Sequence, residues 1–108
     1  MSSAGSSTGV TVVVPVFNAP EETRRCLTAL KATVCSGEAD VIVIDDASTD
    51  PAVPRLLAEV CDPSWYLERQ PNNLGFVGTV NRAMARAGRN DVILLNSDTV
   101  PAGHWLAA

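Results

Sequence analysis

The sequence VIVIDDASTDP, residues 41–51, decides the fold. Its four β-branched residues predict a buried strand of a parallel sheet, because such strands are covered on both faces and are apolar along their length. The strand ends in Asp45 and Asp46, and the pair Asp50–Pro51 is a helix-start signal. A strand, an acidic turn and a helix in this order are typical of an α/β fold.

Three more strands and two more helices are expected around this unit. Val10–Val16 is a second β-branched run, Trp65–Arg69 predicts a more exposed strand, and residues 92–98, VILLNSD, form an apolar strand that ends in Asp98. Further helices are expected from Asn18–Pro20 to about Val34 and from the 73–78 loop to Gly88. The order βαβαβαβ predicts one domain over residues 10–108, with parallel strands and right-handed crossovers.

Finer features of the helices also follow from the sequence. Asn18 and Glu21 have the spacing of a capping box, and Gly88 is expected to end the third helix. The predicted inner face of the first helix carries Leu27, Leu30 and Val34, that of the second Val53, Leu56, Leu57 and Val60, and that of the third Val77, Val80 and Met84.

The composition restricts the functional classes. The 108 residues are 46% hydrophobic with a net charge of -4 and scattered arginines, which argues against a nucleic-acid partner. Cys26, Cys35 and Cys61 have no metal-site spacing and are expected to be free thiols of a reducing compartment. Residues 1–9 are predicted to be a flexible tail, and no apolar run is long enough to cross a membrane. A soluble cytoplasmic protein is the expectation.

The strand-end carboxylates are the main candidates for chemistry. Mg²⁺ and Mn²⁺ prefer carboxylate oxygens together with substrate phosphates, so one strand-end Asp can suffice if a diphosphate supplies the other ligands. The alternative is that these residues cap turns and helices. Capping is the preferred interpretation for Asp50, both interpretations stay open for Asp45, and a functional role is preferred for Asp46 and Asp98.

The loops exclude two common nucleotide-binding motifs. The first strand is followed by Pro15-Val16-Phe17-Asn18 rather than G-x-G-x-x-G, and there is no P-loop sequence. The 73–78 segment, NLGFVG, opens the third helix, where glycine allows close approach of a ligand or tight helix packing. The single histidine, His104, has no partner that spacing would imply and is expected to be structural.

Four of these segments together resemble the family 2 glycosyltransferases, and most closely their rhamnosyltransferase-like branch. The segments are VVVPVFN at 12–18, VIVIDDASTD at 41–50, NLGF at 73–76 and LLNSD at 94–98. The resemblance implies a GT-A fold: a Rossmann-like three-layer sandwich with a parallel sheet of order 3-2-1-4, of which this chain would be the truncated nucleotide-binding half. Members of the family build polysaccharides and other glycoconjugates.

The resemblance also implies the site. The nucleotide pocket would be lined by Pro15, Phe17, Asn18, Asp46, Asn73, Gly75, Asn81, Asn96 and Asp98. Asp46 would contact the base, and Asp98 would hold the diphosphate through Mg²⁺ or Mn²⁺. The donor would be a UDP-, dTDP- or GDP-linked sugar, with hexosyl or rhamnosyl transfer by inversion. The general base is expected beyond Ala108, so the chain would bind the donor without transferring it.

Two other functions stay open, together with one consequence for assembly. The chain could be a non-catalytic α/β interaction module that has kept the fold. A nucleotidyltransferase is less favoured, since no Gly-rich basic loop follows the first strand. If further strands of the family's sheet are missing, the strand at 92–95 becomes an exposed apolar edge, and a homodimer through this edge is expected.

Overall fold

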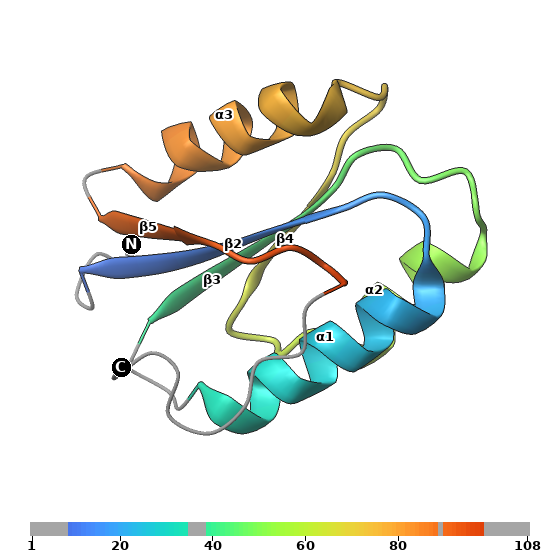
Figure 1. Cartoon of the computed structure of the whole chain (residues 1–108), viewed down its shortest axis with the longest axis horizontal. Helices are drawn as coiled ribbons and strands as arrows, with labels where there is room; N and C mark the ends of the chain where they lie inside the picture. The colour runs from blue at the N-terminus through green and yellow to red at the C-terminus, as the bar shows by residue number, and fades with distance from the viewer. Residues whose placement is uncertain (1–8, 35–38, 89, 99–108) are drawn as a thin grey trace.

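The chain folds around one parallel four-stranded sheet. A computed structural model describes residues 9–34, 39–88 and 90–98. The elements follow the predicted order: β2 (Val10–Val16), α1 (Pro20–Thr33), β3 (Asp40–Asp45), α2 (Ala52–Val60), β4 (Tyr66–Arg69), α3 (Gly75–Ala87) and β5 (Asp91–Leu94) (Figure 1). The strand order β4-β3-β2-β5 is the expected 3-2-1-4, which confirms the Rossmann-like α/β fold.

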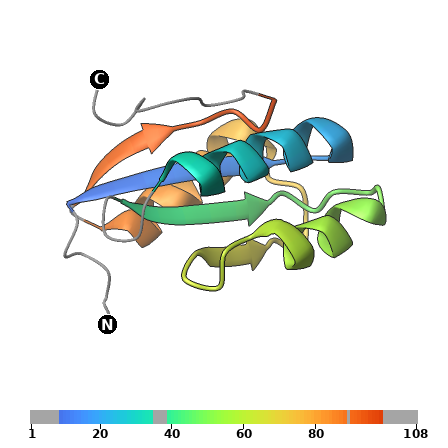
Figure 2. The same ribbon diagram turned by 90° about the horizontal axis from the view of Figure 1, so that it is seen from below.

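Helices cover both faces of this sheet. Figure 2 shows α1 and α2 in front of the sheet and α3 behind it. Alternate residues of β2 therefore enter different cores: Val12 and Val14 pack with α1 and α2, while Val13 packs with Ala83 of α3. Because both faces are buried, the continuous apolar runs in β2 and β3 have the pattern expected of a central parallel strand.

The register brings the carboxyl ends of the strands to one edge of the sheet. Val16 pairs with Asp45, and the ladder continues beyond it, because Asp46 N donates to Val16 O at 2.8 Å. On the outer sides, Leu95 N donates to Val13 O and Gln70 N to Asp45 O, both at 2.9 Å. The segments after β2, β3, β4 and β5 therefore leave the sheet at the same end.

The predicted inner face of α3 is wrong for two of its three residues, and only Val80 is partly buried. Val77 and Met84 are 70% and 49% exposed, whereas Thr79 and Ala83 are buried against the sheet. α3 carries apolar side chains on more than one side, so the periodicity of its sequence does not determine which side faces the sheet. The small side chains at 79 and 83 allow α3 to approach the sheet closely, and the hydrogen bonds at its first residue set its orientation.

The predicted capping box of α1 is also wrong. The N-cap is Ala19, with a φ of 53° and no side-chain hydrogen bond, and Asn18 uses its side chain elsewhere. Two other helix ends have the expected residues nearby, although Pro51 rather than Asp50 is the N-cap of α2. Asp50 Oδ1 accepts a hydrogen bond from Ala52 N at 2.9 Å, and Gly88, with a φ of 69°, ends α3 through its N–H to Met84 O.

The remaining sequence expectations concern the cysteines, His104, the tail and membrane-spanning helices. Cys26 and Cys61 are free thiols, as predicted. Cys35, His104 and the tail up to residue 8 lie outside the described residues. Within the described ranges, no helix is both long and apolar enough to cross a membrane.

Candidate functional site

A cleft of about 550 Å³ opens at the edge of the sheet where the strands end. Its walls come from the segments after β2, β3 and β5 and from the start of α3. The lining residues are Pro15, Val16, Phe17, Ala19, Asp46, Asn73, Gly75, Phe76, Thr79, Asn96, Ser97 and Asp98. Ligands of open α/β sheets bind at this position, outside the carboxyl ends of the strands.

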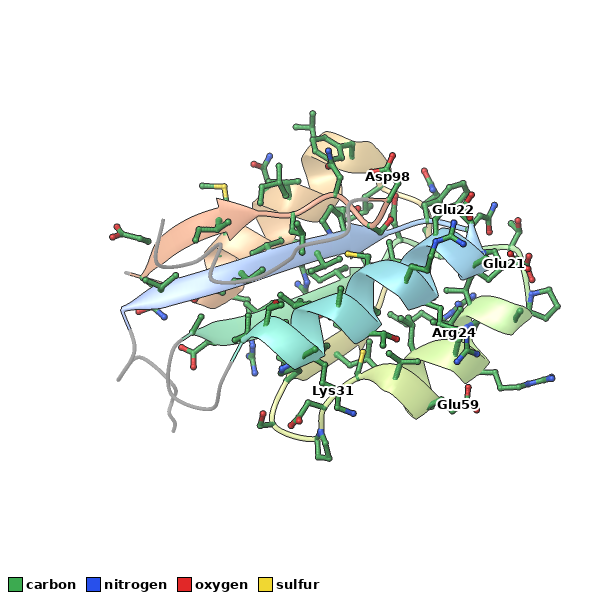
Figure 3. The ribbon with its side chains drawn as sticks, turned by 60° about the horizontal axis from the view of Figure 1, so that its bottom comes forward. Glu21, Glu22, Arg24, Lys31, Glu59 and Asp98 are labelled. Atoms are coloured by element: carbon green, nitrogen blue, oxygen red, sulfur yellow. The ribbon has the colours of Figure 1, made fainter. Side chains whose placement is uncertain are left out.

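Asp98 is the exposed carboxylate of this cleft. It forms no hydrogen bond or ion pair within the part of the chain that the structure describes, so its oxygens are open to a ligand. Figure 3 shows Asp98 at the same end of the molecule as Glu21 and Glu22, near the start of α1. Neither glutamate lines the cleft, so Asp46 and Asp98 supply its carboxylates.

A hydrogen bond from α1 holds the segment that carries Asp98. The buried thiol of Cys26 donates to Asn96 O at a Sγ–O distance of 3.6 Å. Burial raises the pKa of Cys26 to about 11, and the negative charge of Asp98 contributes to the rise. The Cys26 thiol is therefore neutral at physiological pH and acts as a small, weakly polar anchor.

Asp46 is a buried carboxylate with several hydrogen bonds, only 4% exposed. Its Oδ1 accepts from Gln70 Nε2 at 2.8 Å and from Leu74 N at 2.7 Å, and its Oδ2 accepts from Gly75 N at 2.9 Å. The carboxylate thus satisfies backbone donors at the start of α3 and suits the positive end of the helix dipole. Asp46 fixes α3 to the end of β3.

The first residue of α3, Gly75, has a backbone conformation that favours glycine. Gly75 has a φ of 79°, in the left-handed region, and this conformation directs its N–H to Asp46. Asn73 supports the same contact from the other side, because its Nδ2 donates to Asp46 O at 3.1 Å. Asn73 and Gly75 both line the cleft.

Asn18 joins two loops and does not line the cleft. Its Oδ1 accepts from Thr49 N at 2.9 Å and from Asp50 N at 3.0 Å, and its backbone N–H donates to Ser48 Oγ at 2.8 Å. The segments after β2 and β3 are therefore held together, although about 30 residues separate them. Asn18 supports the cleft wall through this link.

Asp45 has a structural environment. It is 1% exposed, accepts from Ser48 N, and forms an ion pair with Arg69 at 2.7 Å from Nη1 to Oδ2. Of the two interpretations left open for Asp45, the structure supports the turn-forming one, because both carboxylate oxygens bind groups of the protein.

Seven of the nine predicted site residues line one cleft: Pro15, Phe17, Asp46, Asn73, Gly75, Asn96 and Asp98. The other two do not; Asn18 bridges loops, and Asn81 is an exposed residue of α3. Five further residues line the cleft and were not among the predicted site residues: Val16, Ala19, Phe76, Thr79 and Ser97. Thr79 could have been predicted from the sequence, because it lies one helical turn after Gly75 and therefore on the same side of α3.

Residues 11–108 match the family described as Glycosyl transferase family 2, and the chain belongs to this family. An N-acetylglucosaminyltransferase of Rhizobium leguminosarum bv. phaseoli is 30% identical over 96 residues, covering 86% of this chain and 22% of that protein.

Two solved structures have a similar fold. The mannosyltransferase PcManGT from Pyrobaculum calidifontis, in complex with GDP-Man and Mn²⁺, has a TM-score of 0.71 and 26% identity over 88% of this chain and 29% of its own. S. aureus TarS 1-349, in complex with UDP, has a TM-score of 0.66 and 25% identity over 82% of this chain and 27% of its own. The present chain therefore spans between a fifth and a third of these relatives, and its sheet has the GT-A arrangement.

Proposed function

We propose that this chain forms the donor-binding part of a glycosyltransferase, with the nucleoside diphosphate of a nucleotide sugar in the cleft between β5 and α3. The observation that carries the proposal is that seven predicted nucleotide-site residues line a single cleft. Similarity to proteins solved with GDP-Man and with UDP supports it. Sugar transfer, hexosyl or rhamnosyl and with inversion, is proposed for the whole protein, whose relatives are several times longer.

The cleft suits a divalent cation that is shared with the donor. Asp98 offers an exposed, hard oxygen ligand without a competing hydrogen bond in the described ranges. In those same ranges, no three Asp, Glu, His or Cys side chains gather into a metal-binding group. Asp98 would therefore hold Mg²⁺ or Mn²⁺ together with diphosphate oxygens, and the bound ion would stabilise the negative charge of the leaving diphosphate.

Calorimetry tests both parts of this proposal. UDP, dTDP and GDP are titrated into the chain with and without Mn²⁺, and at least one of them is expected to bind only in the presence of the ion. Asp98→Ala is expected to weaken this binding at least about tenfold, because a charge-assisted ligand is lost. Asp91→Ala is the matched control: it removes an exposed carboxylate at the opposite end of the same strand, β5, and should leave binding unchanged.

Two results would contradict the proposal. If none of the three nucleotides binds to the wild-type chain, the cleft is not a donor site, and the interaction module becomes the better interpretation. If Asp98→Ala binds as well as the wild type, Asp98 does not hold the metal-bound diphosphate.

The proposal extends to location and assembly. The free thiols of Cys26 and Cys61 fit a reducing compartment such as the cytoplasm. Among the described residues β5 is paired on one side only, by β2, and its sequence is mainly apolar. We therefore keep a homodimer through this edge as part of the proposal.

A further inference from the structure

Exposed apolar side chains are concentrated at α3. Among the described residues, the exposed large hydrophobic side chains include Leu74, Phe76, Val77 and Met84, which are 54%, 56%, 70% and 49% exposed. Leu74 directly precedes α3, and the other three belong to it. Within the described ranges, α1 and α2 expose no large hydrophobic side chain. We call these four residues the α3 surface.

The α3 surface includes the side of the helix that faces away from the sheet. Val77 and Met84 are two helical turns apart and therefore lie on the same side of α3. Thr79 and Ala83 are buried on the side that faces the sheet. Figure 1 shows α3 along the outside of the molecule, across the sheet from α1 and α2. Large apolar side chains gathered on an outer helix indicate an interaction site.

The charge around the α3 surface is positive, although the net charge of the chain is -4. Residues 69–90 contain four of the 8 basic residues of the chain and none of its 12 acidic residues. Two of these arginines, Arg82 and Arg86, belong to α3. Arg82 donates to Glu68 through Nε, but its side chain is 58% exposed, against 16% for Glu68. The positive charge is therefore the more accessible one.

This combination suits a lipid bilayer better than another protein. Helices that lie in a membrane interface carry Phe and Leu on one side and Arg or Lys on the other, and the basic residues attract anionic lipids. A protein interface contains about one hydrogen bond per 100–200 Å². The side chains of the α3 surface offer no strong donor or acceptor, and the acyl region of a bilayer requires none.

We propose that the α3 surface binds to lipid bilayers that contain anionic lipids, with α3 parallel to the membrane plane. Val77 and Met84 enter the boundary between headgroups and acyl chains, and Arg82 and Arg86 bind lipid phosphates. The inference is independent of the proposed donor-binding function. Because Phe76 also lines the cleft, docking brings the cleft to the membrane surface.

Vesicle flotation at low ionic strength tests the apolar part of this inference. The chain is mixed with vesicles of phosphatidylcholine alone, or with vesicles in which phosphatidylglycerol replaces about a third of it. The wild type is expected to float with the anionic vesicles and, to a smaller extent, with the neutral ones. Val77→Asp should lower partitioning into both at least about tenfold, because a charge replaces an apolar group that enters the membrane.

Leu67→Asp is the matched control for Val77→Asp. Leu67 is also exposed, at 42%, but it pairs in register with Val43, which packs with residues of α1 and α2. Paired residues share one side of a sheet, so Leu67 lies across the sheet from α3. Leu67→Asp should leave vesicle binding unchanged.

A second pair of variants tests the contribution of charge. Arg86→Gln should weaken binding to the anionic vesicles about fivefold and leave binding to the neutral vesicles unchanged, because each basic residue near an anionic surface adds to the attraction. Arg55→Gln is the control, since it removes an exposed arginine of α2 on the opposite side of the sheet. It should bind both kinds of vesicle as the wild type does.

Three results would overturn the inference. The first is a wild-type chain that floats with neither kind of vesicle, and the second is an equal loss of binding in Leu67→Asp and Val77→Asp. In the third, Val77→Asp separates dimers in sedimentation velocity without changing vesicle binding, which would make the α3 surface a contact between copies of the chain. Thermal unfolding checks that each variant is folded, and Met84→Ser, with a smaller expected loss, replaces Val77→Asp if that variant is not.

Discussion

Among the described residues, three other than glycine have left-handed backbone conformations, and all three lie beside the cleft. Asn18 and Ala19 follow β2, and Ala47 follows β3, with φ values between 53° and 56°. Such conformations are unfavourable for residues with a Cβ and persist where surrounding contacts enforce them. Here the hydrogen bonds of Asn18 to Thr49 and Asp50 supply that constraint.

Gly75→Ala is predicted to damage the cleft. A Cβ at this position meets no atom within 4 Å, so the cost comes from the φ of 79° and is about 1–2 kcal/mol of stability. If the loop relaxes, the N–H of residue 75 turns away from Asp46, and nucleotide binding weakens.

Gly88→Ala is the matched control, because Gly88 also has a positive φ and open space but lies at the far end of α3. Thermal unfolding should show a loss of stability for both variants, and calorimetry a loss of binding for Gly75→Ala alone. Equal nucleotide affinity in the two variants would show that the geometry of the Gly75 loop does not matter for the site.

At the scale of elements, α3 is held against β4 by surface charges as well as by packing. Glu68 of β4 accepts from Arg82 Nε of α3 at 2.7 Å and from Tyr66 OH at 2.8 Å. Arg86 of the same helix lies over the ring of Tyr66, 3.9 Å from its centroid. The hydrogen bond from Arg82 is the largest of the effects that lower the pKa of Glu68.

The sign of this pKa shift predicts how pH affects stability. Because the folded chain lowers the pKa of Glu68, its ionised form stabilises the fold above pH 4.5, and this contribution is lost as the pH falls through the folded pKa. Glu68→Gln should therefore lower stability at pH 7, by up to about 1 kcal/mol, and by less at pH 3.

Glu59→Gln serves as the control for this experiment. Glu59 pairs with Arg24 across α1 and α2, but its side chain is 63% exposed, against 16% for Glu68. Chemical denaturation at both pH values should give a smaller difference for Glu59→Gln. A Glu68→Gln effect that does not change between pH 7 and pH 3 would contradict the electrostatic explanation.

The elements differ in how well the sequence predicts them. The strands were predictable because β2 and β3 consist of β-branched residues that are buried on both faces, a local property. The rotation of α3 was not, since it depends on Gln70 and Asp46, which lie 9 and 33 positions before Thr79 in the chain. The role of Asn18 was missed for the same reason, because the partners of its side chain are 31 and 32 residues away.

At the scale of the whole molecule, the two outer strands of the described sheet differ in character. β4 carries Glu68 and Arg69, whose charges discourage pairing with another sheet. β5 is Asp91-Val92-Ile93-Leu94, and Leu94 is 43% exposed. Self-association is therefore expected at β5.

Sedimentation velocity over a range of concentrations tests this expectation. The wild-type chain should show dimers that Leu94→Lys shifts towards monomers, because a charge on an edge strand opposes pairing. Leu67→Lys is the control, since Leu67 is similarly exposed, at 42%, on the opposite edge strand. A monomer at all concentrations, or an equal effect of both variants, would refute a dimer through β5.

The Cys26 thiol under Asn96 provides an internal reporter for the position of Asp98. The negative charge of Asp98 contributes to the raised pKa of Cys26, about 11, so Asp98→Asn should lower this pKa. In a chain that also carries Cys35→Ser and Cys61→Ser, the ultraviolet absorbance of the Cys26 thiolate should therefore appear at lower pH. An unchanged profile would place the carboxylate too far from the thiol to influence it. Thus a sulfur atom of the hydrophobic core can report, without any bound ligand, whether the Asp98 carboxylate lies near it.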